Sequence, residues 1–269
     1  MDLLTPLAFI AAVAAVLLAD LLDGGRLGAL LNAPAMLLVL GGTLGATAMT
    51  VPAEELLALP QVLWRLLRPD VTPMERTIGK IAALGEVARR EGLLRLEDAL
   101  QGSSVPPFLR HGLQGVVDGT DEHRLRTLLE RELSLYERRQ AKGAQFFLSA
   151  GGFAPTLGII GTVVGLVSVL SHLSDVQRIA PAIATAFIAT LWGVASANLF
   201  WLPISYKLSR TLAQEVLVRE MIVEGCVAIA AGRNPRLILE QLSAFKGDGP
   251  ADAAAADEGA LRAQGGGPG

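Results

Sequence analysis

The amino-acid sequence predicts an all-α integral membrane protein with four transmembrane helices. A helical cytoplasmic domain is expected between the second and third of them, and a helical cytoplasmic extension follows the fourth. The first observation is composition, since 51% of the 269 residues are hydrophobic and the mean hydropathy is +0.45. The second is length, because about 20 apolar helical residues cross a hydrocarbon core of about 30 Å. Four stretches meet that length: residues 3–22, 33–53, 146–170 and 179–206.

The basic residues orient these four stretches. Of the 23 Lys and Arg, 14 lie between the second and third stretches and 7 follow the fourth, while the two short connections hold only Arg26 and Arg178. Basic residues near the ends of transmembrane helices stay in the cytoplasm. The first stretch lacks the basic start of a signal peptide, so we expect it to be retained. The sequence therefore predicts a multi-pass protein with both termini in the cytoplasm.

The connecting segments divide the chain into five regions. Residues 1–53 hold the first two transmembrane helices and 146–206 the last two. Residues 54–145 form a cytoplasmic helical domain, 207–246 form cytoplasmic helices, and 247–269 form a tail. The tail is rich in Gly, Ala and acidic residues and has too little apolar surface to fold, so it is predicted to be disordered.

Helix start and stop signals refine the cytoplasmic regions. Thr72 and Pro73 are expected to begin a helix that Gly92 ends. A charged helix from Asp121 has no breaker before Gly143, so it is expected to run nearly into the third transmembrane helix. After the fourth, a long helix is expected to end at Gly232, and Asn234 with Pro235 is expected to begin a last short one.

The third and fourth stretches carry small residues at helical spacing. Gly158, Gly161, Gly165 and Gly193 allow close helix–helix approach, which is how transmembrane helices associate. Thr162 and Thr190 lie near mid-span beside a glycine, where their hydroxyls are candidates for lining an ion path. Thr156 and Thr185 also offer hydroxyls but are less favourably placed, and the alternative for any of the four is a hydrogen bond back to a carbonyl one turn earlier.

Spans two to four contain no Asp, Glu, Lys, Arg or His. A cation or proton site within lipid normally needs an ionisable group. Asp20, one turn from the end of the first span, is expected to be interfacial. We therefore infer that this chain holds no ion by itself and that a partner supplies the carboxylate.

There is no convincing catalytic constellation, one cysteine (Cys226) gives no disulfide framework or metal cluster, and the net charge of −3 disfavours nucleic-acid binding. The chain is predicted not to be an enzyme and to need no cofactor or metal.

Two prolines stand near the cytoplasmic edges of these spans. Pro155 lies inside the third stretch, and Pro203 lies just before the basic exit of the fourth. Each removes a backbone hydrogen bond and is expected to kink its helix. Such kinks are candidate hinges between an ion path and the cytoplasmic domain, with a fixed bend as the alternative.

The segments "GGFAPTLGIIGTVVGLVSVLSHLSD" and "IAPAIATAFIATLWGVASANLFWLPISYKL" resemble the last two spans of the flagellar motor stator A subunits (MotA/PomA type). "EGCVAIAAGRNPRLILEQL" resembles the C-terminal segment of that family, and "ARREGLLRLED" its rotor-facing stretch. The resemblance implies a subunit of the bacterial inner membrane that forms a homo-oligomer, a pentameric ring, around two copies of a single-span B subunit of MotB type. The aspartate of the B subunit would carry the ion, and residues 54–145 would push a rotor switch protein of FliG type.

The resemblance also assigns roles to individual residues. Thr162 and Thr190 match hydroxyls that line the ion path, and Pro155 and Pro203 match two functional prolines. Rotor contacts are implied for a charged group of four residues: Arg89, Arg90, Glu97 and Asp98.

Sodium-type members have two threonines where this chain has Ala189 and Thr190. The loss of one oxygen favours a proton over a sodium ion, which needs several oxygen ligands. Thr162 points the other way, because many proton-type chains have Ala there. On balance we expect protons to be the coupling ion.

Three alternatives to a stator subunit remain open at this point. A TolQ/ExbB-type motor protein shares the two-span core, but such chains typically have three spans and the N-terminus outside. A self-sufficient channel or transporter would need its own coordinating groups or broken helices at the membrane midplane. A passive membrane scaffold fits the glycine packing and leaves the hydroxyls unexplained.

Overall fold

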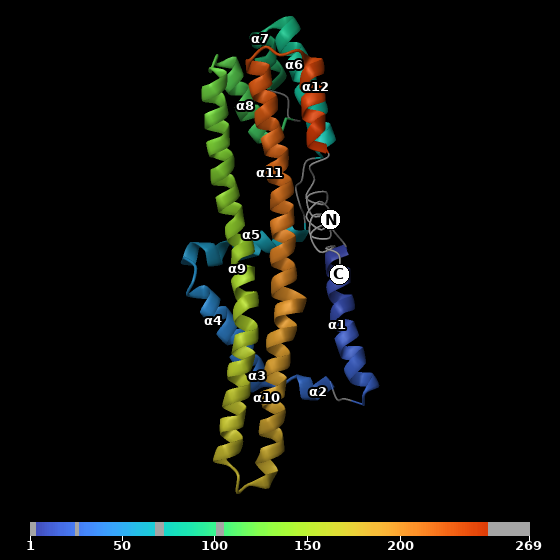
Figure 1. Ribbon diagram of the computed structural model, residues 1–269, viewed down its shortest axis with the longest axis vertical. Helices are drawn as coiled ribbons and strands as arrows, with labels where there is room; N and C mark the ends of the chain where they lie inside the picture. Colours follow the sequence, from blue (N-terminus) through green and yellow to red (C-terminus); the bar gives the residue numbers. More distant parts are fainter. Residues whose placement is uncertain (1–3, 25–26, 68–72, 101–104, 247–269) are drawn as a thin grey trace, which may run out of the picture. The chain divides into compact units, whose positions relative to one another are not determined.

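The computed structural model describes residues 4–24, 27–67, 73–100 and 105–246, and every regular element in these ranges is a helix (Figure 1). The helices of the first half are α1 (Leu4–Leu22), α2 (Leu27–Leu30), α3 (Ala33–Met36), η1 (Leu37–Gly41), α4 (Gly42–Ala48), α5 (Ala53–Leu67), α6 (Met74–Glu91), α7 (Leu93–Leu100) and α8 (Pro107–Val117). Those of the second half are α9 (Glu122–Ser171), α10 (Val176–Ser196), η2 (Ala197–Trp201), α11 (Leu202–Ala230), α12 (Pro235–Ser243) and η3 (Ala244–Lys246).

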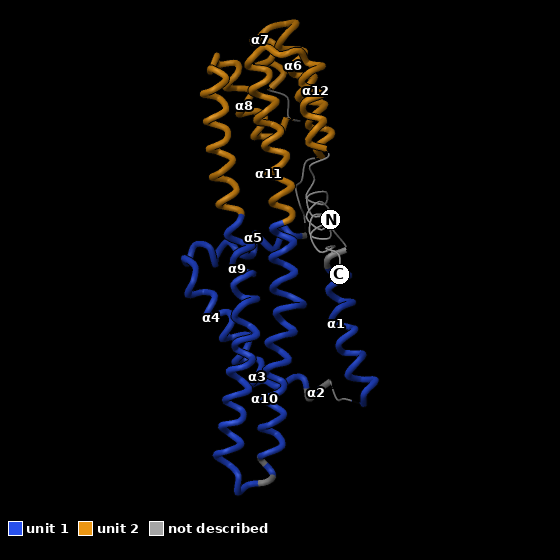
Figure 2. Tube along the Cα trace, in the orientation of Figure 1, with its two compact units in different colours: residues 1–69, 141–209 blue, residues 70–140, 210–269 orange. Residues whose placement is uncertain are grey.

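The chain forms two compact units, and α9 and α11 contribute to both (Figure 2). Unit 1 comprises residues 1–69 and 141–209, and unit 2 comprises residues 70–140 and 210–269. The predicted boundaries at 145 and 206 lie a few residues from these divisions, and α5, at the start of the predicted cytoplasmic domain, falls in unit 1. The division into cytoplasmic and membrane regions stays a prediction. The tail 247–269 lies outside the described residues.

Two helices among the described residues are long and apolar enough to cross a membrane: Glu122–Ser171 and the continuous helix Ile179–Ala230. Helix α1 is apolar but shorter. The sequence predicted one helix over residues 33–53, but the structure has no such continuous helix. The helical segment ends at Ala48, and α5 follows after a bend of 118°. Pro52 explains the break, because a proline disfavours helical geometry at the preceding residue, here Val51.

The core of unit 1 lies between α5 and the helices α9 and α11. Phe146 and Phe147 form a T-shaped aromatic pair with ring centroids 5.5 Å apart, and Phe147 and Trp201 form a tilted pair at 6.1 Å. Apolar residues of α5, among them Leu59 and Val62, pack on this group. Aromatic pairs of this kind add about 0.5–1.5 kcal/mol to the burial of their surfaces.

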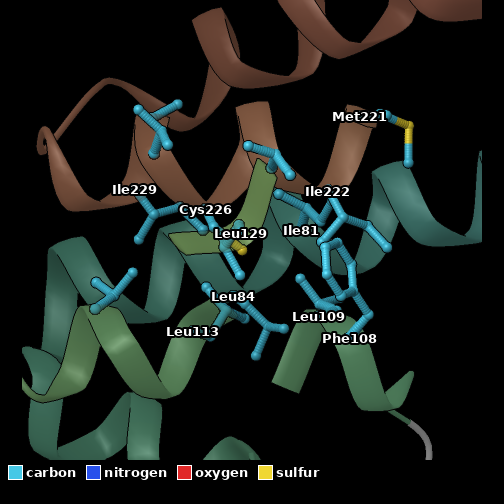
Figure 3. Close-up of a cluster of buried hydrophobic side chains, with 14 of the residues drawn as sticks. Ile81, Leu84, Phe108, Leu109, Leu113, Leu129, Met221, Ile222, Cys226 and Ile229 are labelled. Atoms are coloured by element: carbon cyan, nitrogen blue, oxygen red, sulfur yellow. The ribbon is translucent and has the colours of Figure 1, made fainter. Parts of the chain in front are cut away.

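Unit 2 is built around a core to which α6, α8, α9, α11 and α12 all contribute. Ile78, Ile81 and Leu84 of α6 recur at helical spacing, which is why one face of that amphipathic helix is buried. Figure 3 shows Ile81, Leu113 and Leu129 converging on Cys226 of α11. Burial of each such side chain stabilises the fold by about 1.5–3 kcal/mol.

The expected helix ends can be compared with the structure. Gly92 (φ 84°) and Gly232 (φ 66°) adopt the left-handed conformation that favours glycine directly after α6 and near the end of α11. Asn234 caps α12, its Oδ1 accepting from the backbone N of Arg236 at 3.1 Å. Helix α6 begins at Met74, with Pro73 as its N-cap residue, and Thr72 lies outside the described residues. The charged helix from Asp121 does not stop near Gly143 but continues through it as α9.

Candidate ion-path interface

Helices α9 and α10 meet along a line of glycines. A Cβ added to Gly193 would lie 2.7 Å from the carbonyl oxygen of Ala154 and 3.0 Å from the Cα of Gly158. Real Cβ atoms essentially never approach other atoms to under 3.0 Å. A Cβ added to Gly161 or to Gly165 would lie 2.5 Å from the Cβ of Ala189 or 2.6 Å from the Cβ of Ala186, respectively. The four predicted packing glycines therefore all lie in this contact, where backbone meets backbone.

Thr162 and Thr190 come together in the same contact. Their hydroxyls are hydrogen-bonded to each other, and both side chains are half-buried. Thr162 Oγ1 lies 3.2 Å from the carbonyl oxygen of Gly158 and 3.4 Å from that of Ala186, and Thr190 Oγ1 lies 3.4 Å from that of Gly158. Two hydroxyl and two carbonyl oxygens thus gather at one level of α9 and α10. An arrangement of this kind can hydrogen-bond to water or to a protonated carboxyl group.

Ala189 occupies a different surface from its neighbour Thr190. It is 1% exposed, faces Gly161 and forms a small buried cluster with Ala35 of α3 and Val39 of η1. The structure places its methyl group in helix packing. Its bearing on which ion is used stays a prediction from the resemblance.

Sequence reasoning missed a polar connection between α10 and the start of α3. Asn32 Oδ1 accepts from Ala35 N at 3.0 Å and so caps α3, while Asn32 Nδ2 donates to Thr185 Oγ1 at 2.9 Å. Trp192 Nε1 donates to the carbonyl of Leu30 at 2.8 Å. The signal was present, because Asn before Ala-Pro is a common helix start. Thr185 also makes the back-bond expected of it, to Pro181 O at 3.0 Å.

Thr43 and Thr47 of α4 were also missed. Both are fully buried, and their hydroxyls donate to Val39 O at 2.6 Å and Thr43 O at 2.7 Å. These back-bonds satisfy a buried hydroxyl inside its own helix. They follow a π-helical turn, η1, a feature often found at functional sites.

The two prolines lie inside long helices. Helix α9 (Glu122–Ser171) continues without a break through Pro155. Pro203 follows the second π-helical turn, η2, in which Trp201 is buried. A wider turn beside a proline accommodates the missing N–H, because the local ladder of hydrogen bonds is already interrupted. The hinge role of Pro155 and Pro203 stays a prediction.

The residues expected to contact a rotor lie in unit 2, around the left-handed turn at Gly92. Arg89 and Glu97 are exposed on α6 and α7. Arg90 forms an ion pair with Glu86 at 2.7 Å, and Asp98 lies 3.6 Å from Arg95. Exposed pairs such as these contribute about 0–1 kcal/mol, so they can exchange partners at little cost.

Unit 2 also holds a charged network that the sequence did not reveal. Arg126 of α9 donates two hydrogen bonds to Glu224 of α11, at 2.5 and 3.0 Å. These hydrogen bonds, together with the charge of Glu224, raise the pKa of Arg126. The same bonds and the charge of Arg126 lower the pKa of Glu224. Desolvation opposes the shift in both groups. The pair lines a groove of about 440 Å³ that Glu220 and Glu137 also face. Desolvation, and then the charge of Glu137, raise the pKa of Glu220.

Arg219 and Cys226 complete this part of unit 2. The Arg219 guanidinium carbon lies 3.6 Å from the ring centroid of Tyr136, and the Tyr136 hydroxyl is hydrogen-bonded to Glu215. Cys226 is fully buried, and burial raises the pKa of its thiol to about 12. A protonated, buried thiol is unreactive. No group of three or more His, Cys, Asp or Glu among the described residues is placed to hold a metal ion.

This pairing of apolar, glycine-lined helices matches known proteins. The model of the MotA/TolQ/ExbB proton channel family matches residues 101–221. Motility protein A of Bacillus subtilis (strain 168) is 34% identical over 244 residues, 90% of this chain and 90% of that protein. Chemotaxis protein PomA of Vibrio alginolyticus is 33% identical over 249 residues, 93% of this chain and 97% of that protein. The solved structure of the flagellar MotAB stator complex from Bacillus subtilis aligns with a TM-score of 0.79 and 34% identity, covering 87% of this chain and 91% of that one.

The chain therefore belongs to the MotA/TolQ/ExbB proton channel family, and the relatives that match it over most of its length include motility protein A and chemotaxis protein PomA. This confirms the family that the sequence segments resembled.

Proposed function

We propose that this chain is the A subunit of an ion-driven flagellar stator. The observation that carries the proposal is the α9–α10 contact, where Thr162 and Thr190 bring two hydroxyls together in helices that hold no ionisable residue over 143–171 and 179–206. A wall of this composition can pass a proton or ion only if another molecule provides the charged group. The stator relatives support the same assignment, because they match both units of the chain.

The partner that would supply the missing charged group is a single-span B subunit of MotB type with an intramembrane aspartate. The MotAB stator complex, solved for a relative, supports such a partner. This chain would surround it as a homo-oligomer, a pentameric ring, in the bacterial inner membrane. Helix α1 and the α3–α4 segment would add to the two long helices, giving four spans with both termini in the cytoplasm.

Unit 2 would deliver the force. Ion passage turns the ring, and the exposed charges of α6 and α7 push on a rotor switch protein of FliG type. One charge that crosses 100 mV releases about 2.3 kcal/mol. That is enough to exchange exposed ion pairs, which are worth about 0–1 kcal/mol, and far less than the stability of a folded domain.

A TolQ/ExbB-type role belongs to the same family and is the main rival. It is disfavoured because Motility protein A of Bacillus subtilis and chemotaxis protein PomA of Vibrio alginolyticus align over 90% and 93% of this chain. A self-sufficient channel is disfavoured by the absence of ionisable residues from the third and fourth spans.

Charge reversal at the proposed rotor face tests this function. The chain and its B subunit are expressed in a motile strain that lacks its own stators, and torque is measured from a bead attached to a flagellum. Arg89→Glu should lower torque at high load, and an opposite charge change on the rotor protein should restore it. Arg76→Glu, on an exposed position of the same helix outside the proposed contact, is the matched control. Full torque in Arg89→Glu would remove this face from force transmission, and failure of the unaltered pair to restore any rotation would contradict the stator assignment.

A further inference from the structure

Helix α9 carries a row of exposed side chains on the side that faces away from α10. The row consists of Thr156, Ile160, Val163 and Val167, which are spaced by four, three and four residues and are all exposed. Such spacing keeps them on one side of the helix, because successive helical residues are turned by about 100°. Thr156 lies about 140–200° around the helix from the glycines that face α10. This α9 row therefore has no contact with α10 of its own chain.

A second row with the same spacing runs along α10 and into η2. It consists of Phe187, Leu191, Val194 and Asn198, and all four are exposed. Asn198 lies about 120–180° around the helix from the small residues that face α9. This α10 row therefore faces away from α9. Each row holds three apolar side chains and ends in one polar side chain.

The polar ends of the two rows lie at nearly the same level. The hydrogen bond between Thr162 and Thr190 marks one level of the antiparallel helices α9 and α10 (Figure 1). Thr156 is six residues, about 9 Å, from Thr162, and Asn198 is eight residues, about 12 Å, from Thr190 in the same direction. The polar ends thus differ in level by about 3 Å. Because both rows are spaced by four, three and four residues from their polar ends, their apolar members also match in order.

The two polar side chains have complementary hydrogen-bonding groups to spare. Thr156 Oγ1 donates its proton to the carbonyl of Phe153 at 2.7 Å, which leaves the lone pairs of the hydroxyl oxygen. Asn198 Nδ2 donates to the carbonyl of Val194 at 2.9 Å, which leaves its second N–H and Oδ1. Neither side chain has a further hydrogen-bond partner among the described residues. One therefore offers an acceptor and the other a donor.

We propose that the α10 row of one copy packs against the α9 row of the next copy, and that Asn198 Nδ2 donates a hydrogen bond to Thr156 Oγ1 across this contact. The inference rests on the homo-oligomeric ring proposed above and names the side chains that set its register. A contact between two different faces of the same chain is head-to-tail, which is the kind that builds a ring. A ring around the membrane normal keeps all copies at one depth, so the matched levels of the two rows are what it requires.

Lipid is a poor occupant of these rows because of their polar ends. Asn198 is nine residues, about 14 Å, from Lys207, the first charged residue after the fourth apolar stretch. Its short side chain cannot reach water from there, and an amide group left unbonded in hydrocarbon is costly. Polar side chains in such positions hydrogen-bond to neighbouring helices.

A second copy also fits better than a single-span partner. One helix of a partner would cover one row and leave the other open. A copy of this chain covers both, because each copy brings the acceptor on α9 and the donor on α10. The two rows are thus complementary halves of one contact between copies.

Disulfide cross-linking tests the proposal. The full-length chain is expressed with its B subunit, and the membranes are oxidised with copper phenanthroline. One variant combines Thr156→Cys with Asn198→Cys, and a second combines Val163→Cys with Leu191→Cys, which leaves the polar pair intact. The matched control combines Thr156→Cys with Phe187→Cys, on the same two rows but about 16 Å apart along them, whereas a disulfide joins Cα atoms no more than about 7 Å apart. The native Cys226 is buried, so the unsubstituted chain gives the background.

Both level-matched pairs should give a ladder of covalently linked copies, several-fold stronger than the control pair gives. Equal cross-linking of matched and control pairs would overturn the proposal, and so would the absence of a ladder from both matched pairs. The mass of the unsubstituted complex in detergent separates this inference from the proposed function. A ring that fails to cross-link overturns the inference alone, whereas a monomeric chain removes the ring and the inference together.

A double-mutant cycle tests the hydrogen bond itself. Asn198→Leu and Thr156→Val each remove one polar group and keep a side chain of similar size. A hydrogen bond between transmembrane helices changes an equilibrium constant by about three-fold. Each single variant should therefore raise the dissociation constant between copies by about three-fold, measured from the mass distribution on dilution in detergent. The double variant should be no weaker than either single one, and additive effects of the two substitutions would show that the side chains are not bonded to each other.

Discussion

The hydroxyls of Thr162 and Thr190 are hydrogen-bonded to each other within the close, glycine-lined contact of α9 and α10. Gly158 allows this contact, because a Cβ there would lie only 3.2 Å from the Cα of Thr190. Its carbonyl oxygen lies 3.2 Å from Thr162 Oγ1 and 3.4 Å from Thr190 Oγ1. The oxygens are therefore held by the packing of the two helices, and changes in packing and changes in hydroxyl chemistry can be separated by mutation.

Removal of one hydroxyl from this pair should impair ion-driven rotation without preventing assembly. Thr190→Val keeps the branched shape and loses the oxygen, whereas Thr190→Ser keeps the oxygen. A hydrogen bond contributes about 1 kcal/mol, a factor of about five in a rate or an equilibrium constant. Swimming speed should fall in Thr190→Val and largely survive in Thr190→Ser at equal membrane abundance. Equal speeds in the two variants would show that the hydroxyl serves only packing.

The glycine line should tolerate no added methyl group. In Gly193→Ala, the new Cβ meets backbone atoms of Ala154 and Gly158 that belong to a neighbouring helix and cannot rotate away. Overpacking of this kind costs about 1–3 kcal/mol. We expect a lower Tm in detergent and less protein in assembled complexes.

Gly152→Ala is the control for this prediction. Nothing lies within 4 Å of a Cβ at Gly152, which is also in α9, so alanine there should be neutral or slightly stabilising. If the two variants had the same Tm, the close approach of α9 and α10 would be incorrect.

Two glutamates of the unit 2 groove should respond to pH with opposite signs. The pKa of Glu224 is lowered, so its charged form stabilises the fold above the ordinary carboxyl range, and that contribution is lost as the pH falls through the lowered pKa. The pKa of Glu220 is raised, so its charged form destabilises the fold at neutral pH, and protonation relieves this as the pH falls through the raised pKa. At pH 7, Glu224→Gln should lower the free energy of unfolding by about 1 kcal/mol, and Glu220→Gln should raise it slightly.

The buried thiol of Cys226 provides the measurement. Because Cys226 lies in the core of unit 2, its reaction with a maleimide in increasing denaturant reports the unfolding of that unit. The difference in free energy of unfolding between each variant and the unsubstituted chain should shrink in acid. There the glutamate of the unsubstituted chain is protonated and is neutral, as the glutamine of the variant is. A stabilised Glu224→Gln chain at pH 7 would refute the assigned role of the Arg126 ion pair.

The coupling ion gives a further prediction. With Ala189 in place of a threonine, the chain offers one oxygen fewer than the sodium-type members it resembles, so we expect protons to drive rotation. Swimming should persist when sodium in the medium is replaced by potassium at constant proton-motive force. Rotation that stops on this replacement alone, and returns with sodium, would reverse the assignment.

The sequence predicted those features that depend on local pattern. Glycine spacing identified the α9–α10 contact, and the position of Thr162 and Thr190 beside glycines singled out the two hydroxyls that meet. It did not predict the bend before α5, because counting apolar residues over 33–53 does not take account of Pro52, which disfavours helical geometry at Val51. The Arg126–Glu224 bond and the Asn32–Thr185 bond join residues far apart in the chain, and no local periodicity encodes such pairs.

The most direct test of the central claim is the proton current through reconstituted vesicles with and without the single-span partner. The purified chain alone, which has no ionisable group in its third and fourth spans, should carry no selective cation current. Addition of the partner should restore proton flux, and replacement of the partner's intramembrane aspartate by asparagine should abolish it. A selective cation current through this chain alone would contradict the account.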